Sequence, residues 1–144
     1  MADGIRDRLV GIALEWQRRF GVAPSITSAI SEFDAVGLVN MTLSEYESQC
    51  VPRTAVTRGC DFVYQGCRYQ IKGSRPSGKP GSKVLLVARA GNFDWHRLIW
   101  ILYDTAYNMQ EAWEWDVQEY RSRFESKKLL LVSGMRQGRR IFPT

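Results

Sequence analysis

Three polar side chains stand in an otherwise aromatic and branched stretch of the sequence, from Cys60 to Pro76. Asp61 lies in the first of two short β-like runs, and Gln70 and Lys72 lie two residues apart in the second. A carboxylate and an amide oxygen are ligands for a hard cation such as Mg²⁺, and the backbone carbonyl of Ile71 adds a third. A lysine beside them can hold a water molecule or neutralise charge on a phosphate. These residue types predict metal-assisted hydrolysis of a phosphodiester.

A hairpin loop at Gln65-Gly66 would bring these side chains together. Glycine at the second position suits a two-residue loop, although glutamine is not the favoured first residue. Such a loop pairs Tyr64 with Cys67, and therefore Asp61 with Gln70, with Cβ atoms about 5 Å apart. Because side chains alternate along a strand, the acid, the amide and the lysine then share one face. The other face carries Phe62, Tyr64, Cys67, Tyr69 and Ile71. A longer loop would shift this register.

This arrangement resembles the PD-(D/E)XK nuclease superfamily, which has the restriction-endonuclease-like fold. In that pattern an acid begins one strand and (D/E)-X-K lies on the next, as Asp61 and Gln70-Ile71-Lys72 do here. Many members also carry a Glu on the preceding helix, and Glu32 in SAISEFDAVGL matches that position. The resemblance covers about residues 25 to 103. It implies that Asp61, Gln70, Ile71 and Glu32 hold Mg²⁺ or Mn²⁺ and that Lys72 acts at the scissile phosphate of DNA.

The sequence departs from that pattern at two positions. Cys60 replaces the proline that precedes the acid, and Gln70 replaces the second acid. The second change removes a negative charge, which lowers the expected affinity for the metal unless Glu32 compensates. An alternative is therefore a catalytically inactive nucleic-acid-binding or protein-interaction module with the same fold. A further alternative is a solvated strand face on which Asp61 and Lys72 form a weak ion pair.

The charge of the chain favours an anionic partner. The formal net charge is +5, and the segment Gly73 to Lys83 contains positive charges without a negative one. Basic loops of this kind can follow the phosphate backbone of DNA, which is the expected role of Arg75, Lys79 and Lys83. The same composition also serves as solubilising surface.

Length and composition predict one domain, residues 1–144, with an ordinary core. Hydrophobic residues make up 44% of the chain and charged residues 24%, as in soluble proteins. No apolar run is long enough to cross a bilayer, and the first residues show no export signal. The three cysteines, Cys50, Cys60 and Cys67, are an odd number, which indicates reduced thiols. These features predict a cytoplasmic protein without a membrane partner.

Hydrophobic periodicity and turn residues predict the elements of the fold. Helices are expected at about 3–20, 26–39 and 117–126, the last with Asp116 as its N-cap. Strands are expected at 61–64, 67–72, 84–89, 97–103, 109–115 and 129–134. Residues 42–50 fit a short helix, residues 51–58 read as a loop, and 73–83 is a loop. The order predicts an α/β fold with a central mixed β-sheet flanked by helices, preceded by N-terminal helices.

Two groups of apolar residues are expected to build the core. The first helix carries a stripe at helical spacing, which we expect to face inward: Ile5, Leu9, Ile12, Ala13, Trp16 and Phe20. Four tryptophans cluster later in the chain, at Trp95, Trp100, Trp113 and Trp115. Exposed tryptophans can stack on bases, but this spacing beside branched residues favours a core or a homodimer surface.

Overall fold

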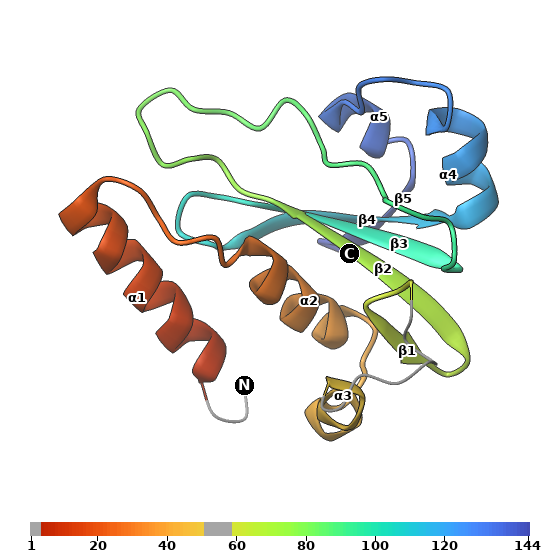
Figure 1. Cartoon of the computed structure of the whole chain (residues 1–144), viewed down its shortest axis with the longest axis horizontal. Coiled ribbons are helices and arrows are strands. Elements are labelled where there is room, and N and C mark those ends of the chain that lie inside the picture. Colours follow the sequence, from red (N-terminus) through yellow and green to blue (C-terminus); the bar gives the residue numbers. More distant parts are fainter. Residues whose placement is uncertain (1–3, 51–58) are drawn as a thin grey trace.

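The computed structural model describes residues 4–50 and 59–144 as an α/β fold with a mixed β-sheet (Figure 1). Its elements are α1 (Ile5–Phe20), α2 (Thr27–Leu38), α3 (Leu43–Cys50), β1 (Phe62–Tyr64), β2 (Cys67–Ser74), β3 (Arg97–Tyr103), β4 (Met109–Asp116), α4 (Val117–Phe124), α5 (Val132–Met135) and β5 (Arg139–Phe142). None of the helices in these two ranges has the length and apolar composition needed to cross a membrane.

The five described strands lie in the sheet in the order in which they occur along the chain. The pairs β1–β2, β3–β4 and β4–β5 are antiparallel, and β2–β3 is parallel. Two parallel neighbouring strands need a long connection that returns the chain from the end of the first strand to the start of the second. Residues 75–96 supply it without a helix and pass over one face of the sheet (Figure 1).

Each face of the sheet supports its own hydrophobic cluster. On one face, residues of α1 and α2 pack with β-sheet residues that include Phe62, Tyr69 and Ile71. On the other face, the 75–96 connection, α4 and α5 cover Leu98 and Trp100. Figure 1 shows α1, α2 and α3 on one side of the sheet and α4, α5 and the long connection on the other. The central strands are therefore buried from both sides.

The hairpin between β1 and β2 has the predicted turn and register. Gln65 and Gly66 both have positive φ, 50° and 75°, as a type I′ turn requires. Tyr64 lies opposite Cys67, and Val63 opposite Arg68. The apolar face predicted for the hairpin is confirmed, because its members pack in the cluster beneath α2.

Most of the predicted elements of the second half are confirmed. Four consecutive residues of β3, from Leu98 to Ile101, are buried, as expected for a strand covered on both faces. The Asp116 side chain accepts hydrogen bonds from the first turn of α4, which confirms the predicted N-cap. Trp95, Trp100 and Trp115 are at most 2% exposed and belong to the core.

Two predicted strands are wrong. Residues 84–89 form an extended connection with a single isolated bridge, between Leu86 and Leu131. The segment 129–134 leads into α5 instead, and the last strand is β5, in the basic tail. Apolar runs this short do not distinguish a strand from a covering loop, because both bury the same side chains. In the range 42–58, α3 occupies Leu43–Cys50, and 51–58 lies outside the described residues.

The rotation of α1 also differs from the prediction. Five members of the expected inward stripe are substantially exposed: Ile5, Leu9, Ile12, Trp16 and Phe20. The inward side instead carries Arg6, whose guanidinium donates to both carboxylate oxygens of Asp34 on α2 at 2.9 Å. Asp34 also accepts a 2.7 Å hydrogen bond from Tyr103 on β3. This ion pair joins α1 to α2 and to the sheet.

Helix α2 packs closely on β2 at Gly73. A Cβ atom at this position would lie 2.6 Å from Cβ of Ser31, so the helix could not approach as closely over another residue. Ile30 and Val36 are almost completely buried in the same contact layer. The packing of α2 therefore covers the side of β2 that carries Tyr69 and Ile71 and leaves Gln70 and Lys72 on the opposite side.

The Arg6–Asp34 pair makes a prediction about stability. Asp34→Asn removes the negative charge that faces Arg6, and both side chains are largely buried, with exposures of 14% and 11%. We expect the free energy of unfolding to fall by about 3 kcal/mol, because a buried guanidinium would lose its partner. Urea unfolding followed by circular dichroism measures the change.

Asp7→Asn is the matched control. Asp7 lies 3.1 Å from the same guanidinium, but its side chain is 71% exposed. An exposed pair contributes at most about 1 kcal/mol, so this variant should remain close to the parent chain in stability. Equal losses for the two variants would contradict the role given to Asp34.

Candidate active site

Asp61 and Gln70 lie side by side at the open end of the β1–β2 hairpin. The backbone N–H of Asp61, the residue before β1, donates to the carbonyl of Tyr69 at 2.8 Å, and Tyr69 is also the register partner of Phe62. Oδ2 of Asp61 accepts from the Ile71 N–H at 2.7 Å and from Nε2 of Gln70 at 3.1 Å. The two side chains are therefore in contact, although the strand pairing itself ends at Phe62 and Tyr69 and does not include Asp61.

Lys72 lies on the same face of β2 as Gln70. The register with β3 places Gln70 beside Leu98 and Lys72 beside Trp100, and both β3 residues belong to the cluster under α4 and α5. The Lys72 side chain is half-buried. Among residues 4–50 and 59–144, it forms no hydrogen bond or ion pair. A half-buried lysine two residues from Gln70 on the same face of β2 is well placed to meet an anion.

Glu32 lies on α2, which packs on the other face of β2. Its carboxylate accepts a 2.7 Å hydrogen bond from the hydroxyl of Tyr46 on α3. Burial and the contact with Glu32 both raise the pKa of the Tyr46 phenol. The Tyr46 ring meets Phe62 edge-on, which places this pair with the cluster beneath α2. Glu32 therefore lies on the face of β2 that α2 covers, opposite the face that carries Gln70 and Lys72.

The three basic residues predicted to contact nucleic acid have different environments. Arg75 is held by the protein itself, because it donates to the carbonyl of Thr105 and to Oε1 of Gln17 and lies 4.6 Å from the ring centre of Tyr107. Lys79 is exposed in the connection after β2. Lys83 is also exposed and lines a cavity, described next.

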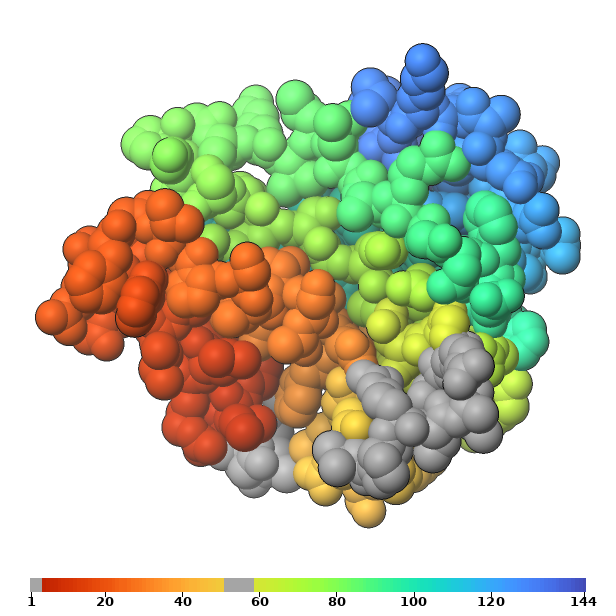
Figure 2. Space-filling view, in the orientation of Figure 1, coloured from red at the N-terminus to blue at the C-terminus, as the bar shows by residue number. Residues whose placement is uncertain are grey.

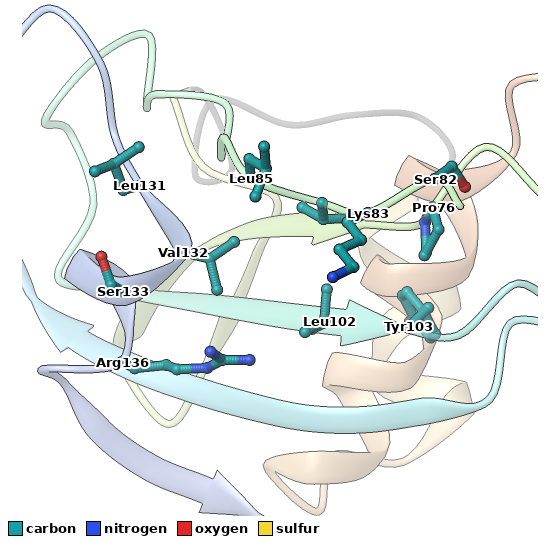
Figure 3. Close-up of a pocket in the computed structure, with 11 residues that line it drawn as sticks. Pro76, Ser82, Lys83, Leu85, Leu102, Tyr103, Leu131, Val132, Ser133 and Arg136 are labelled. Atoms are coloured by element: carbon teal, nitrogen blue, oxygen red, sulfur yellow. The ribbon is translucent and has the colours of Figure 1, made fainter. Parts of the chain in front are cut away.

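An open cavity of about 580 Å³ lies on the same face of the sheet as Lys72 (Figure 3). Its floor includes Leu102, which pairs with Ser74, two residues beyond Lys72. Lys83 and Arg136 extend into it from opposite walls (Figure 3). Arg136 donates to both carboxylate oxygens of Glu111, at 2.6 and 3.0 Å, and this contact lowers the pKa of Glu111. The sequence predicted Lys83 as a phosphate contact in a basic loop and gave no indication that Arg136 lies across a cavity from it.

Two residues of the 75–96 connection approach the hairpin and were not predicted as site residues. Nδ1 of His96 accepts from the Arg68 backbone N–H at 2.9 Å, and the Arg68 side chain donates to the carbonyl of Asp94 at 2.7 Å. A Cβ atom on Gly59 would lie 2.8 Å from Cβ of Asp94. Asp94 is therefore a second acid close to the segment that leads into Asp61. In the sequence, the one signal for this proximity is that Asp94 lies shortly before a buried strand.

The acidic donors around Asp61 are few. Within residues 4–50 and 59–144, no three His, Cys, Asp or Glu side chains come together as a metal site. Among the described residues, the Gln70 side-chain amide contacts the Asp61 carboxylate and is a candidate neutral donor beside it.

Comparisons with known proteins do not identify a family or a function for the chain. No protein-family model matches the chain. No curated protein shows significant similarity to it.

The Asp61 carboxylate makes a prediction about the hairpin. Asp61→Ala should lower the free energy of unfolding by about 1 to 3 kcal/mol, because the Ile71 N–H loses its acceptor in a partly buried position. Asp61→Asn keeps a carbonyl oxygen and should lose less. Thermal unfolding in the presence of EDTA compares the two variants with the parent chain. Alanine and asparagine variants of equal stability would show that the carboxylate does not support the hairpin in this way.

Proposed function

We propose that this chain is a small metal-dependent nuclease that hydrolyses phosphodiester bonds of DNA, with a restriction-endonuclease-like fold of the PD-(D/E)XK type. The observation that carries the proposal is the 3.1 Å contact between Asp61, the residue before β1, and Gln70 on β2, with Lys72 two residues further on the same face of β2. An acid, a neutral oxygen donor and an ammonium group are the three components that such a reaction needs.

The donor set fits Mg²⁺ or Mn²⁺. Asp61 supplies a carboxylate, and Gln70 supplies an amide oxygen once its side-chain amide turns by half a rotation. The nitrogen and oxygen of such an amide are assigned from their hydrogen bonds, so this rotation needs no movement of the strand. The backbone carbonyl of Ile71 is the third donor in the proposal. When bound, the cation would polarise the phosphate and assist formation of a nucleophile from water.

Lys72 has the role of a phosphate-binding cation in this proposal. The residue is half-buried on β2, at the register position next to Trp100 of β3. A lysine in that position stabilises negative charge that increases as the phosphodiester reacts. Lys83, further along the same face, adds a positive charge that a DNA backbone would meet, whereas Arg136 is paired with Glu111.

Glu32 is assigned at most an assisting role. Its carboxylate is engaged by Tyr46, and α2 covers the opposite face of β2 from Gln70 and Lys72. Arg75 is not assigned to DNA, because its guanidinium is fixed between α1 and the turn after β3.

The proposal predicts cation-dependent cleavage. Plasmid and single-stranded DNA are incubated with the purified chain in Mg²⁺ or Mn²⁺, and products are separated by electrophoresis. We expect Asp61→Asn and Lys72→Met each to lower the rate by about a hundredfold or more, because one loses a metal ligand and the other a phosphate contact. Gln70→Glu restores a second acid and should reach half-maximal rate at a lower Mn²⁺ concentration.

Two matched variants serve as controls for the cleavage experiment. Asp94→Asn removes another acid near the hairpin and should leave the rate close to that of the parent chain. Glu32→Gln should lose less activity than Asp61→Asn. Cleavage that survives both Asp61→Asn and Lys72→Met would exclude the proposed site.

A second candidate is a nucleic-acid-binding module without catalysis. The observation that favours it is that Oδ2 of Asp61 already accepts two hydrogen bonds from the protein, so the carboxylate is satisfied without a cation. This candidate predicts DNA binding that weakens steeply as salt is raised, with no cleavage in Mg²⁺ or Mn²⁺. Fluorescence anisotropy with labelled DNA at several salt concentrations measures this. Absence of binding at low salt would exclude it.

A further inference from the structure

Helix α1 presents a continuous apolar stripe to solvent. Its large members recur at intervals of three and four residues, and their exposed fractions are 51% for Ile5, 38% for Leu9, 62% for Ile12, 51% for Trp16 and 61% for Phe20. The rings of Trp16 and Phe20 lie 4.7 Å apart and form one aromatic end of the stripe. Residues at this spacing share one face of a helix, which is the pattern of a seam between helices.

The exposure follows from specific contacts on the inward side of α1. The positions that face the sheet are each one residue later than the stripe: Arg6, Val10, Ala13 and Gln17. Arg6 pairs with Asp34, and Gln17 donates to the carbonyl of Ser77 at 2.6 Å. Val10 and Ala13 are buried between these two anchors. Polar contacts at both ends thus hold the helix with its larger apolar side chains outward. Figure 2 shows α1 at the margin of the molecule, at the left of the view.

Two residues of opposite charge lie beside the stripe. Arg8 and Glu15 are exposed and lie seven residues apart, about two helical turns, along the same margin of the stripe. In two antiparallel helices, residues at this heptad position face each other across the seam. Arg8 of one copy would then meet Glu15 of the other, and the two-fold axis repeats the contact. A parallel pair would instead set these positions against Ala13 and Phe20 and form neither ion pair.

We propose that α1 is a homodimer interface, in which the α1 helices of two copies of this chain pack antiparallel through the apolar stripe. In this arrangement Leu9 packs against Ile12 of the other copy, and Ile5 against Trp16. Such an interface is isologous, so each residue contributes twice. The apolar seam supplies the attraction, and the Arg8–Glu15 contacts select the antiparallel orientation. The inference does not depend on the proposed nuclease activity.

Charge reversal tests this arrangement on the full chain. Sedimentation velocity over a concentration series gives the dimer dissociation constant of the parent chain and of three variants. Arg8→Glu and Glu15→Arg each set like charges against one another twice, and we expect each to raise the dissociation constant at least about tenfold. The double variant Arg8→Glu/Glu15→Arg restores opposite charges and should bring the constant back toward the parent value.

Two further variants separate the interface from the rest of the helix. Ile12→Ser removes apolar surface at the centre of the stripe and should weaken the dimer. Arg18→Glu reverses an exposed charge elsewhere on α1 and should leave the dissociation constant unchanged. Circular dichroism and thermal unfolding establish that each variant is folded. A parent chain that remains monomeric at the highest concentration, or a double variant that fails to recover, would overturn the proposal. If the helices pair in parallel, the double variant should not recover. If the stripe binds a different partner, the parent chain should remain monomeric.

Discussion

The ion pair between Arg6 and Asp34 sets the position of the N-terminal half of the chain. It is bidentate and largely buried, and Asp34 also accepts a hydrogen bond from Tyr103 on β3. Arg6 reaches further, to the carbonyl of Tyr107 after β3. Since a buried charge without its partner is costly, these contacts permit only one rotation of α1 about its axis. That rotation buries Val10 and Ala13 and places the larger apolar residues at the surface.

The position of α2 has a corresponding effect on the candidate active site. The helix approaches β2 at Gly73, where the absence of a side chain makes room for Ser31. Its cover on one side of the strand commits Tyr69 and Ile71 to the core and directs Gln70 and Lys72 to the other side. The candidate site is thus a consequence of which face of β2 the helix occupies. Glu32 remains with the helix, in contact with Tyr46.

The hairpin that carries the site was predictable because its determinants are local. A two-residue loop fixes the register of the strands beside it, and the alternation of side chains then fixes the faces. These two rules predicted Asp61 near Gln70, and the Asp61 side chain does reach Gln70 from the residue before β1. The surroundings of Arg75, Arg136 and Asp94 did not follow, because each depends on the path of the long connection or of the C-terminal segment. Sequence separation of these partners ranges from 25 to 58 residues, beyond the reach of any local pattern.

The sequence by itself determined which segments are α1, α2, β1–β4 and α4, and which hairpin side chains share a face, because periodicity and turn residues act over a few positions. Tertiary structure decided the rest. In α1 the stripes beginning at Ile5 and Arg6 have the same spacing, so periodicity cannot choose between them; the partner at Asp34 does. The strand β5 forms because the tail pairs with β4, where Arg139 lies beside the buried Glu114. A charged tail has no local pattern that predicts a strand, because the strand depends on pairing with β4 and on an ion pair with a buried acid.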